Sequence, residues 1–559
     1  MPRLLSSLPA RTSVTRFRQP LLVLVFAVAL AAVMTWPLLP RLTNSGRTDT
    51  ADGMFSIWVV SWVAHALTTD PAGLYNANIF FPERDTLAYS EANLGAGVLA
   101  IPVWLATHNA YAALNSVAFL SFVLSALAMF ALARHLTGDV AGSLTAAVVF
   151  AYCPFVFAHT AHIQLLMTAG LPLILLSLHR LTERPSPGRA IVLGLAIAFQ
   201  ALSCAYHGVL GAMLVSAGVV WFSVSLRLWR KREWWMAVGM ATVVSIGLTL
   251  PFFMPYLEVQ SSTGFARDIK EAAAYSADWR AWLSSAAWAH RWIREITGRS
   301  AEVLFPGFVA LGFGIAGLVL ALRRPRHDSV APRLTRDVAR FYAAVLVGLA
   351  WLSFGPSAGL YALLYHTVPL FDFLRAPGRI GIGVVLALAV FVAYAIAWLQ
   401  HRWPAARWVG AAMVAVAVMD LCTVPYPMKD RIPRSSIYTA LANDPPGVVV
   451  ELPYYERRPD FPRHTLYMVN STLHWFPLVN GYSDYASPSW RENATFLRAF
   501  PSENSLRLFE QLRGRYVILH GELYARSELA GVKARFAYFH DRLTLVAADG
   551  ETELYELRR

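Results

Sequence analysis

Runs of about twenty apolar residues recur along this chain of 559 residues, and they constrain its fold more than any other feature. An α-helix rises 1.5 Å per residue, so about twenty residues are needed to cross roughly 30 Å of hydrocarbon. The composition agrees, because 56% of the residues are hydrophobic and 15% are charged, against about 25% charged residues in soluble domains. The sequence therefore predicts an α-helical polytopic membrane protein.

About eleven of these runs are predicted to span the membrane. They cover residues 21–39, 111–133, 139–158, 162–179, 190–205, 208–226, 235–256, 302–322, 338–356, 379–399 and 406–426. The first run follows several arginines and is interpreted as an uncleaved helix, with a cleaved signal peptide as the alternative. Segment 93–106 is apolar but short and contains Pro102, so it is predicted to insert only partly.

The net charge of +13 comes mainly from one side of the predicted topology. The segments at every second junction hold about 20 Lys and Arg against about 5 acids, the excess expected of cytoplasmic loops. The outer loops hold about 11 bases and 13 acids. This pattern places the N-terminus inside and the C-terminus outside, and it explains the basicity without nucleic acid as a partner.

The chain is predicted to divide at about residue 427. Residues 1–426 form the expected transmembrane domain, with long outer loops at 41–92 and 257–301. Residues 427–559 have the composition of a soluble domain. The topology puts this second domain outside the membrane, as a small extracytoplasmic α/β domain.

Short patterns in the second domain indicate its strands. The apolar runs 447–452 and 516–519 are of a length typical of buried strands. Residues 543–557 alternate around Asp549-Gly550, which predicts a hairpin.

Two acidic residues, Asp49 and Asp52, mark the start of an amphipathic helix in the first outer loop. A carboxylate near a helix N-terminus is stabilised there and often caps free N–H groups, which is one interpretation of Asp52. A carboxylate also accepts a proton from an attacking hydroxyl, or binds a divalent cation together with a second carboxylate. Both interpretations are open from the residues alone.

Other polar residues gather at the outer ends of predicted helices. Glu91 precedes an apolar segment, where an unpaired carboxylate is costly, so a partner is expected, with a solvated interfacial residue as the alternative. His159 and His162 are spaced to share one helical face, and hydrogen bonds to a phosphate or sugar are favoured over a metal because no further ligand spacing accompanies them. Tyr206 and His207, at the next outer turn, either join the same cavity or anchor the chain at the interface.

Arg375 and Arg379 enter a predicted span from the outer side. The positive-inside pattern disfavours arginine there, so the pair needs an explanation. A phosphate is a natural partner for a guanidinium group. Contact with lipid headgroups is the alternative.

Taken together, these residues resemble the GT-C class of polytopic glycosyltransferases and, more closely, a group of uncharacterised bacterial membrane proteins assigned to that class. The resemblance covers most of the chain. It rests on Asp52-Gly53-Met54-Phe55-Ser56-Ile57-Trp58, Leu87-Ala88-Tyr89-Ser90-Glu91, His159-Thr160-Ala161-His162-Ile163-Gln164, Leu304-Phe305-Pro306-Gly307, Leu374-Arg375-Ala376-Pro377-Gly378-Arg379 and Val479-Asn480-Gly481-Tyr482-Ser483.

The resemblance implies transfer of a sugar from a polyprenyl-phosphate donor to a glycan, lipid or protein acceptor at the outer face of the bacterial cytoplasmic membrane. Asp52 would be the base, with Asp49 as the second acidic residue, and the two arginines would bind the phosphate. The residues that would position the substrates are Glu91, His159, His162, Gln164, Tyr206 and His207. No metal ligand is assigned, although Mg²⁺ or Mn²⁺ is left open because Asp49 and Asp52 depart from a tight Asp-x-Asp.

Two alternatives share these features. A transporter or flippase of lipid-linked saccharides would also have many spans and outer arginines, and a polysaccharide polymerase or ligase would use a similar donor. Transporters usually place polar groups near the membrane midplane and often carry internal repeats. The polar groups here lie mainly at outer helix ends, so sugar transfer is favoured.

Overall fold

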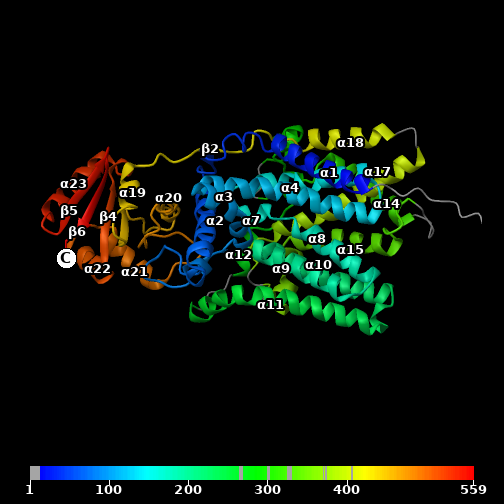
Figure 1. Cartoon of the computed structure of the whole chain (residues 1–559), viewed down its shortest axis with the longest axis horizontal. Coiled ribbons are helices and arrows are strands. Elements are labelled where there is room, and N and C mark those ends of the chain that lie inside the picture. Colours follow the sequence, from blue (N-terminus) through cyan, green and yellow to red (C-terminus); the bar gives the residue numbers. More distant parts are fainter. Residues whose placement is uncertain are drawn as a thin grey trace, which may run out of the picture.

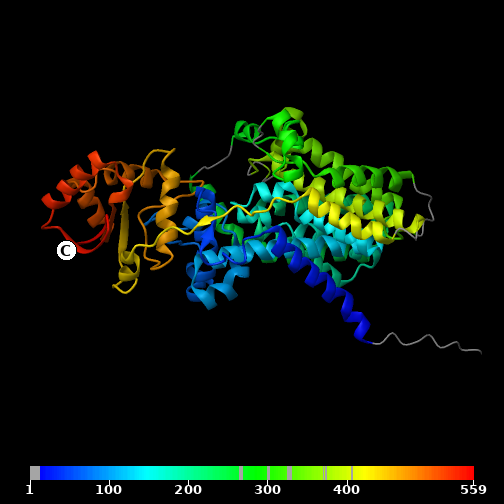
Figure 2. The ribbon, with the colours of Figure 1, turned by 90° about the horizontal axis from the view of Figure 1, so that it is seen from above.

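The computed structural model describes residues 13–263, 268–298, 302–323, 330–368, 371, 374–403 and 407–558. A helical bundle occupies one end of the long axis, and residues 427–558, here called the tail domain, occupy the other (Figure 1). Helices α2 (Ala51–Thr69) and α3 (Leu94–Thr107) lie between them. The view from above shows the same order along the molecule (Figure 2).

Apolar helices build the bundle, and each predicted span contains one of them. They are α1 (Ser13–Met34), α4 (Ala110–Thr137), α5 (Val140–Ala151), α8 (Gly170–Glu183), α9 (Pro187–Ser203), α10 (Ala205–Ser225), α11 (Arg232–Thr263), α14 (Phe308–Arg323), α15 (Arg336–Ser353), α17 (Ile382–Arg402) and α18 (Arg407–Asp420). Within the described ranges, six helical segments are long and apolar enough to cross a membrane, and shorter apolar helices accompany them. The chain is a multi-pass membrane protein, and the number of eleven spans stays a prediction.

Helix α17 forms the centre of the bundle. Every residue from Ile382 to Ala397 is buried, and a Cβ at Gly317 of α14 would meet the Phe391 carbonyl oxygen at 2.0 Å. This close approach requires glycine, as is common where membrane helices pack. Helix α11 instead exposes apolar side chains such as Val243 and Ile246, as expected of a helix that faces lipid.

Two predicted spans are interrupted for local reasons. The run 139–158 divides into α5 and α6 (Pro154–Ala158), because proline lacks an N–H and disfavours helical backbone in the residue before it. In the run 302–322 the helix begins only at Phe308, after Pro306 and after Gly307 with a φ of +96°. Glu302 therefore lies before the helix, in the connecting segment.

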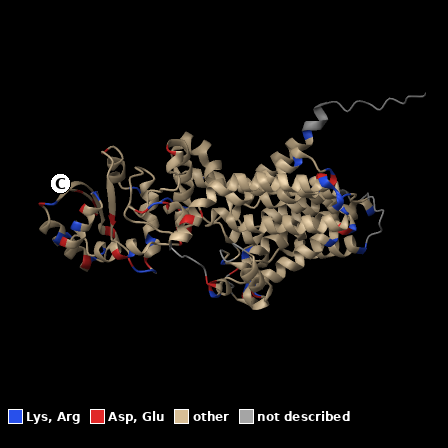
Figure 3. Ribbon diagram, turned by 90° about the horizontal axis from the view of Figure 1, so that it is seen from below, with Lys and Arg blue, Asp and Glu red and all other residues tan. Residues whose placement is uncertain are grey.

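The charges divide along the bundle. Figure 3 shows Lys and Arg gathered at the end of the bundle opposite the tail domain, whereas the middle is almost free of charged residues. This is the distribution expected of a helix bundle with a hydrocarbon layer around its middle.

The tail domain contains a four-stranded sheet in the order β3-β4-β6-β5. Its strands are β3 (Val448–Leu452), β4 (Gly514–His520), β5 (Leu543–Asp549) and β6 (Thr552–Leu557), of which β3 and β4 are parallel and the other pairs antiparallel. The predicted strands and hairpin are confirmed, with Gly550 in the turn at a φ of +62°. The accompanying helices are α19 (Ser436–Leu441), α20 (His464–Ser471), α21 (Pro488–Leu497), α22 (Glu503–Gln511) and α23 (Arg526–Tyr538).

The first outer loop ties the bundle to the tail domain. Strand β1 (Ser45–Gly46) pairs antiparallel with β2 (Lys429–Asp430) at the beginning of the tail domain. The segments predicted to lie outside also contain α12 (Ile269–Ala274), α13 (Arg291–Thr297) and α16 (Leu360–Thr367). The polar residues predicted to form a site lie around this junction.

Candidate active site

Helix α2 begins next to Asp52, but another residue caps it. The Thr50 hydroxyl accepts a hydrogen bond from the Gly53 N–H at 3.1 Å, which satisfies one of the free donors of the first turn. The interpretation of Asp52 as the cap is therefore wrong. Its position in the first turn still favours a negative charge, because the helix dipole is positive at this end.

The Asp52 carboxylate faces two side chains from distant parts of the chain. Its Oδ2 lies 3.3 Å from Nε2 of His162, and its Oδ1 accepts a long hydrogen bond of 3.5 Å from the Tyr482 hydroxyl. The hydrogen bond with His162 lowers the pKa of Asp52, although burial acts in the opposite direction. The side chain is 49% exposed, so Asp52 is an ionised carboxylate within reach of an incoming molecule.

Asp49 has a different partner. Its carboxylate forms an ion pair with the Arg47 guanidinium at 2.9 Å, and Arg47 also donates a hydrogen bond to the Thr160 hydroxyl. Burial raises the pKa of Asp49, but the hydrogen bond and the charge of Arg47 lower it by more, so the pKa lies below its usual value. Asp49 thus fixes the loop. In the described part of the chain, no group of three or more His, Cys, Asp or Glu residues is arranged to hold a metal ion.

Arg375 is held by the protein's own carboxylates. Its guanidinium lies 3.3 Å from Asp484 of the tail domain and 3.5 Å from Glu271 of α12. The Tyr206 hydroxyl accepts hydrogen bonds from the backbone N–H groups of Arg375 and Ala376, which fixes the turn that carries both arginines. The charge of Arg375 also helps to lower the pKa of Asp52. We call Asp52, His162, Tyr482, Arg375 and Asp484 the exposed cluster.

Arg379 lies deeper, in the turn that leads into α17. Its guanidinium stands 5.0 Å from the centre of the Tyr206 ring, and its Nε is buried without a hydrogen-bond partner among the described residues. Nearby, Glu91 accepts a hydrogen bond from the Ala205 N–H at the start of α10, which is the partner that the sequence predicted for it. Burial raises the pKa of Glu91 to about 7, against the effect of Ala205 and the charge of Arg379.

Two more polar residues approach Arg379. His159 lies with its Nε2 3.8 Å from Oε2 of Glu302, and burial raises the pKa of Glu302 to about 7 against the charge of Arg379. Burial lowers the pKa of His159 to about 3, so its ring is neutral and Nδ1–H donates to the Phe155 carbonyl oxygen at 2.8 Å. His207 of α10 is only 1% exposed. The buried cluster consists of Glu91, His159, Tyr206, His207, Glu302 and Arg379.

The predicted site residues thus form two groups. His159 and His162 do not lie on one helix, since they flank the turn between α6 and α7 (Ile163–Leu166), with their ring centroids 6.2 Å apart. One joins the buried cluster and the other the exposed cluster. Gln164 lies partly buried on α7, and Asp49 belongs to neither cluster.

Backbone pairing places Tyr482 over Asp52. Residues 78–81 of the first outer loop hydrogen-bond with residues 478–480 of the tail domain, including the Phe80 N–H to the Asn480 carbonyl oxygen at 3.0 Å. The Asn480 side chain also bonds the backbone N–H and C=O of Glu451 in β3 at 2.8 and 2.9 Å. A Cβ at Gly481 would meet the Phe80 ring at 2.7 Å. These contacts fix the stretch 479–483 against the first outer loop, with Tyr482 beside Asp52.

Four residues at or beside the site were not assigned by sequence reasoning. Tyr482 lies in the stretch 479–483 on which the resemblance rests, but it was given no role. Glu302 begins an apolar run, as Glu91 does, so the same signal marked it. Asp484 directly follows the stretch 479–483. Glu271 of α12 carried no signal, because an acid in a polar outer loop is ordinary.

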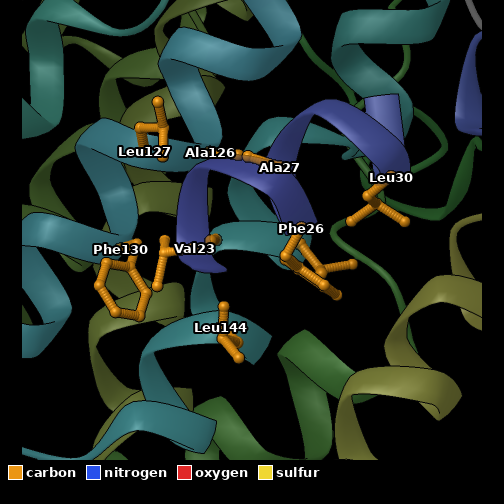
Figure 4. A pocket seen from close by; sticks show the side chains of 10 residues that line it. Val23, Phe26, Ala27, Leu30, Ala126, Leu127, Phe130 and Leu144 are labelled. Atoms are coloured by element: carbon orange, nitrogen blue, oxygen red, sulfur yellow. The ribbon is translucent and has the colours of Figure 1, made fainter. Parts of the chain in front are cut away.

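Two cavities in the described chain lie away from the exposed and buried clusters. One lies between α1, α4 and α5 and is lined by apolar side chains, as Figure 4 shows. They include Val23, Phe26, Ala27, Leu30, Ala126, Leu127, Phe130 and Leu144. A wider groove of about 420 Å³ lies in the tail domain between α23 and the β5–β6 hairpin. Neither hollow contains a residue of the two clusters.

The fold is shared with a solved membrane enzyme. Two structures of the arabinofuranosyltransferase AftD from Mycobacteria align over 96% of this chain with TM-scores of 0.58, at 14% and 17% sequence identity. The chain spans 41% of the length of AftD. A structure of ArnT from Cupriavidus metallidurans in the apo state aligns over 97% of this chain and 98% of ArnT, at 11% identity and a TM-score of 0.39. The likeness to AftD confirms the resemblance to the GT-C class as a likeness of fold.

Residues 74–422 match the family model described as "Domain of unknown function (DUF6311)". The chain belongs to this family. The match covers most of the bundle and the buried cluster, whereas Asp52 precedes it and Tyr482 and Asp484 follow it. A comparison with curated protein sequences found no match.

Proposed function

We propose that the protein transfers a sugar from a polyprenyl-phosphate donor to an acceptor on the outer face of the cytoplasmic membrane. The proposal is carried by the position of the Asp52 carboxylate. It is half-exposed, it contacts His162 and Tyr482, and it does not cap α2, because Thr50 does. It lies at one end of a bundle whose fold matches that of an arabinofuranosyltransferase. A positioned carboxylate at such a junction has the chemistry of a base for an acceptor hydroxyl.

The proposed reaction is a single displacement. Asp52 accepts the proton of the acceptor hydroxyl while the hydroxyl oxygen bonds to the anomeric carbon. The bond from that carbon to the phosphate oxygen breaks, and the polyprenyl phosphate leaves with the electron pair. The configuration at the carbon is inverted. Because a carboxylate with a lowered pKa is a weak base, proton transfer accompanies the attack rather than preceding it.

The leaving phosphate gains negative charge and needs donors. Arg379 is the better candidate, because its Nε lacks a hydrogen-bond partner among the described residues while Arg375 is already paired with Asp484 and Glu271. In this proposal Arg379 binds the phosphate, and Arg375 holds the tail segment beside Asp52. The remaining predicted residues position the donor or the acceptor.

The direct test is a transfer assay with protein in lipid nanodiscs. Polyprenyl-phosphate pentoses and hexoses are supplied with glycan, lipid and peptide acceptors, with EDTA or Mg²⁺ in parallel. We expect one donor to give a product of inverted configuration with the wild type, at a rate that falls roughly 10²–10⁴-fold in Asp52→Asn. Asp70→Asn, at the exposed end of α2, is the control. Equal turnover by Asp52→Asn would remove Asp52 from the mechanism.

The orientation rests on the charge distribution and has a separate test. Alkaline phosphatase fused after the tail domain should be active, because that enzyme folds only outside the cytoplasm. An inactive fusion, together with activity of a cytoplasmic reporter at the same point, would reverse the proposed topology.

A further inference from the structure

Glu302 is a buried carboxyl group that the mechanism above does not use. The residue is 4% exposed, and its Oε2 has no hydrogen-bond partner in the described part of the chain. Nε2 of His159 lies 3.8 Å from Oε2 of Glu302, and burial keeps the His159 ring neutral. An ionised carboxylate in such a place is costly, because burial removes it from solvent and the charge of Arg379 offsets that cost only in part.

The neutral form of Glu302 fits its surroundings better. Burial raises the pKa of Glu302 to about 7, so the protonated carboxyl group is well populated at neutral pH. A protonated carboxyl group is a hydrogen-bond donor and requires an acceptor. Oε2 finds none among the described residues.

A second hydrogen-bond donor without a partner among the described residues lies on the turn that carries Gly378 and Arg379. A Cβ at Gly378 would lie 2.7 Å from Cγ of Glu302, so Glu302 packs directly against the backbone that precedes Arg379. Nε of Arg379 is also buried without a hydrogen-bond partner in the described chain, and His207 lies within range of the Arg379 charge. The protonated carboxyl group of Glu302 and Nε of Arg379 are two donors without acceptors in the described part of the chain, and together they call for a ligand with acceptor oxygens and a negative charge.

The charge of the buried cluster identifies the class of anion. With Glu302 and Glu91 protonated and His159 neutral, Arg379 leaves a single positive charge. A phosphodiester, such as the phosphate of a polyprenyl-phosphate sugar, carries a single negative charge. Ionisation of Glu302 breaks the match, because its carboxylate then repels the phosphate and no longer donates a hydrogen bond to it.

We propose that Glu302, as a neutral carboxyl group, donates a hydrogen bond to the phosphodiester that Arg379 binds, which makes the buried cluster a proton-dependent phosphate site. This inference rests on the proposed function, since the ligand is the phosphate of the lipid-linked donor. The groups that face Glu302 are His159 and Arg379. Glu91 and His207 lie within range of the same Arg379 charge, and the Tyr275 carbonyl oxygen lies against Gly378. Of these, Glu91 also titrates near neutral pH.

The affinity for the phosphodiester depends on pH because the protonated form of Glu302 is the one that donates the hydrogen bond. Affinity is greatest where Glu302 is protonated, below pH 7, and falls as pH rises through about 7. Between pH 6 and pH 8 the protonated fraction, and with it the affinity, falls about tenfold. Glu302→Gln should remove most of this loss, because an amide donates a hydrogen bond at every pH.

The experiment measures binding of farnesyl methyl phosphate to the full chain in nanodiscs at pH 6, 7 and 8. A phosphodiester is chosen because its own charge is constant over this range, and farnesol shows how much binding the lipid chain alone provides. Glu91→Gln is the comparison within the cluster and should retain a pH dependence, because Glu302 still titrates. Glu528→Gln, an exposed glutamate of α23, is the control and should behave as the wild type.

The outcomes separate the inference from the function. A tenfold loss in the wild type that is absent in Glu302→Gln supports the inference. Wild-type binding that is independent of pH, or a Glu302→Gln curve as steep as that of the wild type, overturns it and leaves the proposed function intact. If the wild type binds the phosphodiester no better than farnesol, the proposed function fails as well. Should Glu302→Gln fail to accumulate, Glu91→Gln decides, since Glu302 is then the cluster glutamate that still titrates: a tenfold loss in that variant supports the inference, and a flat curve overturns it.

Discussion

The exposed and buried clusters place two arginines, four residues apart, in opposite circumstances. Arg375 is satisfied by Asp484 and Glu271, whereas Arg379 retains an unused donor and stands among carboxyl groups whose pKa values are raised to about 7. Both arginines enter the bundle from the same end. The difference shows that an arginine at an outer helix end can hold the protein together or remain available to a ligand, according to the carboxylates around it.

The largest effect is expected at the exposed cluster, for Asp52→Asn. The amide cannot accept the acceptor proton, so transfer should fall roughly 10²–10⁴-fold, with the amount of folded protein unchanged. Initial rates with the lipid-linked donor measure this. Asp49→Asn is the matched variant and should lose far less, because Asp49 contacts Arg47 rather than the site. Equal losses in the two variants would erase the distinction between the two acids.

Arg379→Ala tests the comparison itself. Losing charge-assisted hydrogen bonds of about 1.5–3 kcal/mol should raise the KM for the donor roughly 10- to 100-fold. Arg375→Ala should change that KM little and lower kcat, because it releases the segment that carries Tyr482 and Asp484. Steady-state kinetics against the donor distinguish the two. A KM effect confined to Arg375→Ala would exchange the roles of the two arginines.

A smaller effect is expected for Tyr482→Phe. The hydrogen bond to Asp52 is long, at 3.5 Å, so its loss should lower kcat roughly two- to tenfold. The ring, which packs against Phe55 and Phe461, is retained, and the melting temperature should be nearly unchanged. A loss as large as that of Asp52→Asn would mean that Tyr482 itself takes part in proton transfer.

The smallest effect on activity is expected for Gly481→Ala, which acts only through position. The added Cβ presses on the Phe80 ring and should cost about 1–3 kcal/mol of stability if the segment cannot shift. Thermal unfolding followed by light scattering, with the transfer rate measured at low temperature, separates the two consequences. Unchanged stability would show that residues 78–81 and 478–480 yield easily.

Sequence reasoning predicted the apolar helices, the strands of the tail domain and the gathering of polar residues at helix ends, because each depends on a local pattern, and the outer location of these residues stays a prediction. It did not predict that Thr50 rather than Asp52 caps α2, since both residue types favour that position. It also missed that His159 and His162 separate into two clusters, because the break at Pro154 and the turn after it decide where each ring lies. The pairing of Arg375 with Asp484 joins residues more than a hundred positions apart, and no local pattern records it.

The central claim is that proton transfer belongs to the exposed cluster and phosphate binding to the buried cluster. Farnesyl methyl phosphate binding and sugar transfer, measured on the same preparations of Asp52→Asn and Arg379→Ala at pH 6, test it most directly. The account predicts that Asp52→Asn binds the phosphodiester as tightly as the wild type while its sugar transfer falls roughly 10²–10⁴-fold, and that Arg379→Ala loses the binding. Loss of phosphodiester binding in Asp52→Asn, or its retention in Arg379→Ala, would contradict the division of the site.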